Sequence, residues 1–151
     1  MEILEQIEKD YNQAFKEKNE LAVLTLRQLK TVLTNASIAK NREPLAEAEV
    51  IKILRTEVKK RKESAELYRQ GGRPEAAEKE KQEIGIVSRY LPVDLDENTI
   101  KQKIAEVIAK TGAATPADMG KVIGAVVKEL GSQADGSVVS RLVKEALSKL
   151  S

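Results

Sequence analysis

The side chains with the clearest chemical potential are the cations of one short stretch, in which six Lys and Arg residues fall within eleven positions. They are Lys52, Arg55, Lys59, Lys60, Arg61 and Lys62. On a helix, positions 52, 55, 59 and 62 share one side. Such a row attracts a nucleic acid, because each neutralised phosphate releases counterions. The run therefore predicts a surface for an anionic partner, and the alternative is a solvated helix face paired with Glu63 and Glu66.

No aromatic residue is interleaved with this basic run, so stacking of single-stranded RNA bases along it is not expected. The positive charge is concentrated in one stretch and does not extend over the whole chain. The chain as a whole carries only +2, whereas residues 27–62 hold ten Lys and Arg against four Asp and Glu.

Two glycines form a second feature, because Gly120 and Gly124 lie four residues apart inside a segment with helical periodicity. Each costs about 1 kcal/mol relative to alanine in a helix, so some benefit should offset them. Either they let a neighbouring helix pack closely, or they leave a bare groove where a partner backbone such as RNA phosphate approaches. In the second case Lys121 and Lys128 would contact phosphate.

Catalytic and metal-binding side chains are scarce. The chain has no His and no Cys, which removes the commonest general base, the commonest metal ligand and the thiol nucleophile. Ser64 has lysines nearby, but it falls in the middle of an expected helix. The carboxylates are typical of helix caps and solvated faces, and neither a P-loop nor a GxGxxG motif is present. We therefore expect no autonomous active site, no cofactor and no metal.

The elements that must position these groups are all predicted to be helices. Apolar residues recur at helical spacing over residues 2–18, 20–40, 46–69, 74–91, 97–111, 116–130 and 136–150. Asn19, Asp96, Thr115 and Asp135 are the expected N-caps. No segment alternates with period two for long enough to form a strand, so the expected fold class is all-α.

A domain boundary is expected near Pro92, which disfavours a helical conformation of Leu91 and coincides with a change in charge balance. Residues 1–92 are predicted to form a four-helix domain. Gly71 and Gly72 end its third helix and Pro74 begins its fourth, so that these two helices make a long hairpin. Residues 93–151 are predicted to form a small three-helix domain.

The N-terminal segment is acidic and amphipathic, which is typical of neither a secretory signal nor a transit peptide. No apolar run approaches the ~18 residues of a membrane span. We therefore expect a cytoplasmic protein without a membrane partner.

Several stretches resemble a known family. TPADMGKVIGAVVKELGSQADGSVVSRLVKEAL, at 115–147, looks like the GatB/YqeY motif. LAVLTLRQLKTVLTNASI, at 21–38, and the segment from EVKKRK to RYLP, at 57–92, are similar to the N-terminal half of YqeY proteins. A local departure is Ala46, where such proteins often carry a capping Ser, Thr or Asp.

The resemblance implies two helical domains and kinship with the tail of the GatB subunit of glutamine-dependent tRNA amidotransferases. That tail recognises tRNA, while the kinase and amidase chemistry lies in other parts of the enzyme. The positions matching the motif are Met119, Gly120, Lys121, Gly124, Ala134, Asp135, Val139 and Leu142. Among them, Asp135 is expected to cap a helix and Leu142 to lie in the core, which leaves Lys121 as the credible contact. Charge adds Arg141 and Lys144 as candidates.

Three functional hypotheses follow. The leading one is a non-catalytic accessory module that binds tRNA or another structured RNA. The second is a protein–protein adaptor that docks on an amidotransferase or another aminoacyl-tRNA-handling protein. The third is an amidotransferase component, a carbon–nitrogen ligase with glutamine as amido-N-donor, which rests on the resemblance alone.

Overall fold

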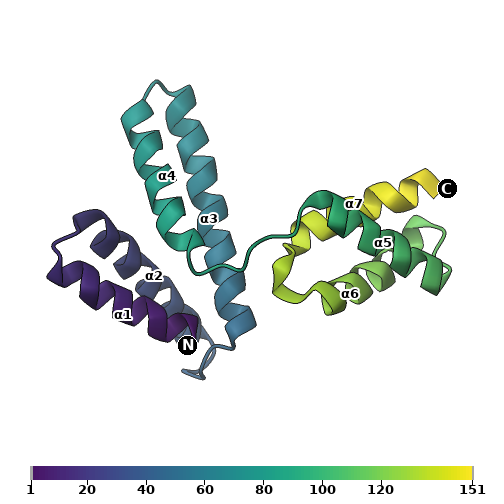
Figure 1. Ribbon diagram of the computed structural model, residues 1–151, viewed down its shortest axis with the longest axis horizontal. Helices are drawn as coiled ribbons and strands as arrows, with labels where there is room; N and C mark the ends of the chain where they lie inside the picture. Colours follow the sequence, from purple (N-terminus) through teal and green to yellow (C-terminus); the bar gives the residue numbers. More distant parts are fainter. Residues whose placement is uncertain (1, 151) are drawn as a thin grey trace. The chain divides into compact units, whose positions relative to one another are not determined.

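The structure is a computed structural model that describes residues 2–150, which contain seven α-helices, two short 3₁₀ turns and no strand. The α-helices are α1 (Ile3–Lys16), α2 (Glu20–Ala39), α3 (Glu47–Gln70), α4 (Pro74–Ser88), α5 (Glu97–Thr111), α6 (Met119–Leu130) and α7 (Gly136–Leu150) (Figure 1). The predicted all-α fold class is confirmed. None of the helices described is both long and apolar enough to cross a membrane.

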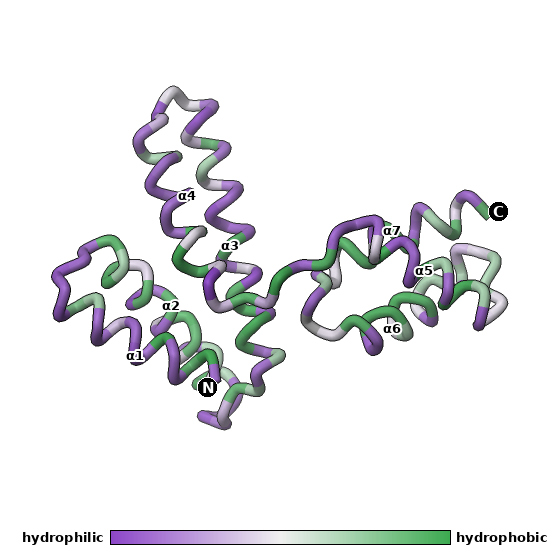
Figure 2. The backbone as a smooth tube through the Cα atoms, viewed as in Figure 1, coloured by the Kyte–Doolittle hydropathy of each residue, from purple (hydrophilic) through white to green (hydrophobic). Residues whose placement is uncertain are grey.

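The chain divides into two compact units, Met1–Leu91 and Pro92–Ser151. Each unit has a hydrophobic core of its own. Hydrophobic and hydrophilic stretches alternate along the helices of both units, as amphipathic helices require (Figure 2).

The first unit contains two antiparallel helix pairs, α1 with α2 and α3 with α4 (Figure 1). The α3–α4 hairpin turns at Gly72, whose φ of 72° suits a residue without a Cβ. The Arg73 N–H then bonds the Tyr68 carbonyl oxygen at 2.8 Å, and Pro74 is the first residue of α4. The long hairpin is thus built as its Gly-Gly and Pro residues predict.

Helix α2 lies against α1, α3 and α4, and its buried face supplies Leu26, Leu29 and Leu33 to the core of this unit. The apolar side chains of α2 are covered only in part, since Leu24 and Ile38 are exposed. The buried apolar side chains of the hairpin and α1 complete the core: Ile7, Ala14, Val50, Leu54, Val58, Ile86 and Val87.

In the second unit, α5, α6 and α7 contact one another pairwise around a core rich in valine. The Leu95 N–H bonds the Gln133 carbonyl oxygen at 3.0 Å, which joins the entry segment to the connection before α7. Leu147 is fully buried, whereas Leu150, three residues further along α7 on the same apolar side, is 57% exposed.

Three of the four expected N-caps form as side-chain hydrogen bonds. The acceptor oxygens of Asn19, Asp96 and Asp135 lie 3.2, 2.8 and 3.0 Å from the backbone nitrogens of Ala22, Thr99 and Ser137. Thr115 instead precedes a 3₁₀ turn, Pro116–Asp118, and α6 begins only at Met119.

At the start of α3, where Ala46 offers no capping group, the Glu49 carboxylate accepts the Ala46 N–H at 3.1 Å. The same carboxylate receives the Lys40 ammonium at 2.6 Å, and these contacts lower the pKa of Glu49, the lysine contact most. The Glu49 carboxylate therefore takes the place of the capping side chain that Ala46 lacks.

Candidate nucleic-acid interface

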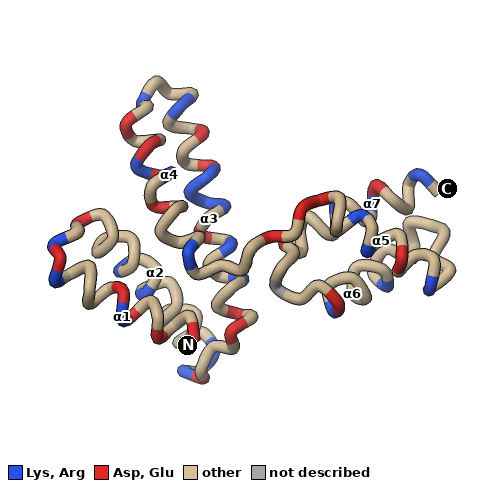
Figure 3. Tube along the Cα trace, viewed as in Figure 1, with Lys and Arg blue, Asp and Glu red and all other residues tan. Residues whose placement is uncertain are grey.

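The basic run occupies the solvent side of α3, because the opposite side of the helix is held in the core. Val50, Leu54, Val58 and Ala65 are buried and fix the rotation of α3 about its own axis. The exposed cations are Lys52, Lys59, Lys60 and Lys62, and Arg55 is half-exposed. Lys and Arg accordingly follow one another along α3 in Figure 3.

Three of these ammonium groups have no acidic partner. Across residues 2–150, Lys52, Lys59 and Lys62 form no ion pair and no side-chain hydrogen bond. Lys60 lies 3.7 Å from a Glu57 oxygen, at the limit of an ion pair. Glu66, one of the acids expected to neutralise the run, instead accepts from the Arg69 Nε at 3.0 Å, and its contacts with Arg69 are the largest cause of its lowered pKa.

Arg61 is the exception within the run, and the expectation that it contributes to a partner-binding surface is wrong. Position 61 is three residues after Val58 and four before Ala65, which puts it on the buried face, and the residue is only 8% exposed. Its guanidinium donates to a Glu57 carboxylate oxygen at 2.9 Å and to the Gln28 side-chain oxygen at 2.8 Å. Arg61 therefore ties α3 to α2.

The charge of Arg61 also acts on Glu80 of α4. Glu83 is 5% exposed. Partial burial raises the pKa of Glu80, the neighbouring charge of Glu83 raises it further, and the charge of Arg61 opposes both effects. The buried Arg61 guanidinium thus offsets negative charge on both α3 and α4, so its role is structural.

The serines next to lysines do not form a nucleophile–base pair. Ser64 is half-buried on α3, and within the described chain it makes no hydrogen bond to a lysine. Ser37 and Lys40 have the Ser-x-x-Lys spacing, which sequence analysis overlooked. The Ser37 hydroxyl donates to the Glu43 carbonyl oxygen at 3.0 Å, while Lys40 binds Glu49, so the two groups serve separate partners.

In the second unit, the two glycines lie on the open face of α6. Gly120 and Gly124 are exposed, and a Cβ added at either position would meet nothing within 4 Å. The expectation that they let another helix pack closely is therefore wrong. Their face continues into the exposed Val127 and is flanked by the exposed Lys121 and Lys128.

The candidates on α7 differ in their availability. Arg141 is paired with Glu97 of α5 and lies 3.4 Å from Glu145, so two carboxylates already occupy its guanidinium. Lys144 is exposed and makes no ion pair within residues 2–150. Asp135 caps α7 and Leu142 is buried, as expected for these two positions of the motif.

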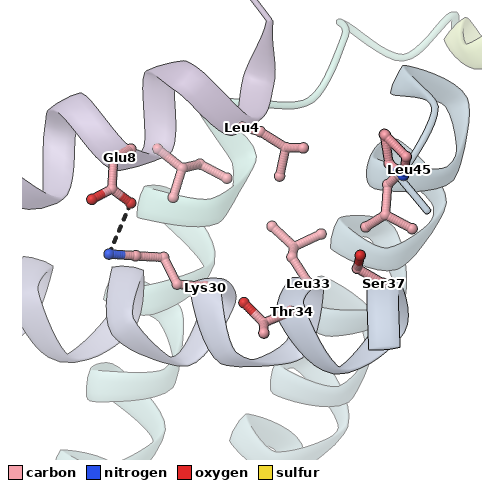
Figure 4. A pocket seen from close by; sticks show the side chains of 9 residues that line it. Leu4, Glu8, Lys30, Leu33, Thr34, Ser37 and Leu45 are labelled. Atoms are coloured by element: carbon pink, nitrogen blue, oxygen red, sulfur yellow. Dashed lines mark ion pairs between the residues drawn. The ribbon is translucent and has the colours of Figure 1, made fainter. Parts of the chain in front are cut away.

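Two neighbouring pockets on the α1–α2 pair had no clear sequence signal, because they depend on which helices pair. The first, of about 270 Å³, has apolar walls that include Leu4, Leu33 and Leu45. At one end of this pocket, Lys30 of α2 pairs with Glu8 of α1 at 2.8 Å (Figure 4). The second, of about 260 Å³, is lined by residues with polar side chains and shares Lys30 and Thr34 with the first.

Comparison with known proteins gives one family and one relative of note. The profile of the family described as Yqey-like protein matches residues 4–147. Altered inheritance of mitochondria protein 41, mitochondrial, from Clavispora lusitaniae is 30% identical over 131 residues, which cover 85% of this chain and 74% of that protein. The name of the Clavispora protein assigns it to mitochondria and states no ligand or reaction.

Proposed function

This chain belongs to the Yqey-like protein family, and from that premise we propose that it is a non-catalytic accessory module that binds structured RNA, tRNA included. The observation that carries the proposal is the row of unpaired ammonium groups of Lys52, Lys59 and Lys62 on the solvent side of α3. Lysine is a strongly hydrated point charge, so it favours phosphate contacts without selecting a base.

The dimensions of the row suit a phosphate backbone. Ten residues separate Lys52 from Lys62, which corresponds to about 15 Å of helix at 1.5 Å per residue. That length spans several phosphates of a folded RNA. Recognition would depend on the shape and charge of the RNA, as is usual when a protein does not read base edges.

The choice of tRNA, and of an amidotransferase or another aminoacyl-tRNA-handling protein as neighbour, comes from the resemblance to the GatB tail. A cytoplasmic location belongs to the same proposal. In the second unit, the exposed Lys121, Lys128 and Lys144 are the side chains available for further phosphate contacts.

A titration of fluorescently labelled tRNA at two salt concentrations tests the proposal. With three phosphates neutralised, affinity should fall roughly fortyfold between 50 and 200 mM salt. Absence of binding even at the lower salt concentration would contradict the proposal.

A second candidate function, docking on a protein partner, is favoured by Leu67. This side chain is 68% exposed near the end of the α3–α4 hairpin, where the Arg73 guanidinium lies 5.1 Å from the centre of the neighbouring Tyr68 ring. Recovery of a protein partner after nuclease treatment, lost on Leu67→Ser substitution, would favour this function over RNA binding.

A further inference from the structure

The second pocket on the α1–α2 pair is lined by residues whose side chains can donate hydrogen bonds to an anion. Its walls come from six residues that all carry side-chain hydrogen-bond donors: Tyr11, Arg27, Lys30, Thr31, Thr34 and Asn35. Two of the six are cations and none is an acid. Donors and positive charge without a carboxylate in the lining match an oxyanion such as a phosphate group.

Much of this donor capacity is unused within the protein. The Arg27 guanidinium donates to the Tyr11 hydroxyl at 3.2 Å and forms no ion pair in the described chain. Thr34 and Asn35 make no side-chain hydrogen bond within residues 2–150. Lys30 is partly committed, because it pairs with Glu8 and lies 4.3 Å from the centre of the Tyr11 ring. Arg27, which also lies 6.0 Å from the centre of the Tyr11 ring, is therefore the cation of the pocket that has no acidic partner in the described chain.

An exposed aromatic ring lies next to this pocket. Phe15 is one helical turn beyond Tyr11 on α1, and the two ring centres are 6.4 Å apart. The Phe15 side chain is 63% exposed, which is unusual for so apolar a group. A free aromatic ring beside a cationic pocket is the combination that proteins use for single-stranded nucleic acids, because any base can stack on the ring.

We propose that this face of the α1–α2 pair binds one unpaired nucleotide of an RNA, with its phosphate at Arg27 and its base on Phe15. The inference rests on the proposed RNA binding and adds to it. The lysines of α3 carry no base contact, whereas this site gives the protein a preference for RNA with a single-stranded segment.

Fluorine NMR provides a direct test, because Phe15 is the one phenylalanine of the chain and 4-fluorophenylalanine labelling yields a single signal. The labelled protein is titrated with pentaadenylate, with a blunt-ended RNA duplex and with inorganic phosphate. Pentaadenylate should shift the fluorine signal, since a base stacks on the labelled ring. The blunt-ended duplex and inorganic phosphate should leave the signal in place.

Two variants distinguish a specific phosphate contact at Arg27 from a general effect of positive charge on affinity. Arg27→Gln should weaken pentaadenylate binding about tenfold, because it removes a charge-assisted contact. Arg42→Gln removes the same charge from an exposed loop outside the pocket and should leave the affinity unchanged. Equal affinities of the two variants would overturn the assignment of the phosphate to Arg27.

The failure of this inference differs from the failure of the proposed function. If the blunt-ended duplex binds at low salt while pentaadenylate leaves the fluorine signal unmoved, the nucleotide site is overturned and RNA binding stands. If no RNA binds at low salt, both are overturned.

Discussion

At the scale of single residues, the surroundings of a charged group decide its role more than its neighbours in sequence do. Lys60, Arg61 and Lys62 are consecutive, yet Arg61 points into the α2–α3 contact while Lys60 and Lys62 face solvent. Burial of the guanidinium is tolerated because Glu57 and Gln28 satisfy its donors. The basic run is therefore a surface with a structural ion pair beneath it.

This ion pair predicts that a single substitution lowers the free energy of unfolding more than a double substitution does. Glu57→Ala leaves the buried Arg61 guanidinium without its hydrogen-bonded carboxylate, so the free energy of unfolding should fall by about 3 kcal/mol. Replacing both residues by Met should recover only part of that loss, because the buried guanidinium is removed while Glu80 and Glu83 of α4 lose a nearby positive charge. Urea denaturation measures both effects, and a Glu57→Ala variant as stable as the parent would show that the pair contributes nothing.

A helix cap predicts a dependence on acidic pH. The Thr99 backbone N–H that bonds the Asp96 carboxylate lowers the pKa of Asp96 from its ordinary 3.8. A carboxyl group with a lowered pKa contributes stability above its unfolded pKa, and this contribution is lost as pH falls through the lower folded pKa. Acidification from pH 5 to about pH 2 should therefore destabilise the second unit in part through Asp96.

Asp96→Asn isolates this contribution, because asparagine also caps helices but does not titrate in that range. The variant should resemble the parent at pH 7 and lose less thermal stability on acidification. Parallel losses in the two proteins, followed by circular dichroism, would mean that the cap does not respond to pH.

At the scale of elements, helix α6 is less stable than it would be with alanine in place of its two glycines. Gly120 and Gly124 lie within the helix, are exposed, and have no atom within 4 Å of the place where a Cβ would stand. Gly120→Ala and Gly124→Ala should therefore each raise the free energy of unfolding by about 1 kcal/mol. Gly112→Ala is the matched control and should lower it, because Gly112 ends α5 with φ 70°. A loss of stability at position 120 or 124 would contradict the open face.

The elements also show how far sequence reasoning extends. Caps at Asn19, Asp96 and Asp135 were predictable because each is set by two or three neighbouring residues. The hairpin was predictable for the same reason, from Gly71, Gly72 and Pro74. The exposure of Ile38 and Leu150 was not predictable, because it depends on how far the neighbouring helices extend.

The candidate sites were likewise predictable where they depend on residues of one helix and not where they depend on how helices pack. The α3 lysines could be identified from spacing within one helix, but the burial of Arg61 depends on α2. The cluster of Tyr11, Phe15 and Arg27 joins residues of two helices, and its members are up to sixteen residues apart. Spacing along one helix gives no sign of such a cluster, since only the pairing of α1 with α2 creates it.

At the scale of the whole molecule, two separate cores predict that a substitution in one unit lowers the stability of that unit and leaves the unfolding of the other unit unchanged. All three tyrosines, Tyr11, Tyr68 and Tyr90, belong to the first unit, and the chain has no tryptophan. Leu142→Ala removes a fully packed side chain from the second core and should destabilise that unit by 2–5 kcal/mol, roughly the range for buried leucines. Near-ultraviolet tyrosine signals should keep the parental unfolding midpoint while part of the far-ultraviolet helix signal is lost earlier. Loss of both signals together would contradict separate cores.

The central claim is that the α3 lysines form an RNA-binding surface, and a comparison of two charge-matched variants in a tRNA titration tests it most directly. One variant replaces Lys52, Lys59 and Lys62 by Gln; the other replaces Lys101, Lys110 and Lys149, which are exposed lysines of the second unit. The first should bind tRNA far more weakly and lose about one unit of salt slope per lysine, while the second should bind like the parent. Equal affinity and equal salt dependence of the two variants would contradict the claim.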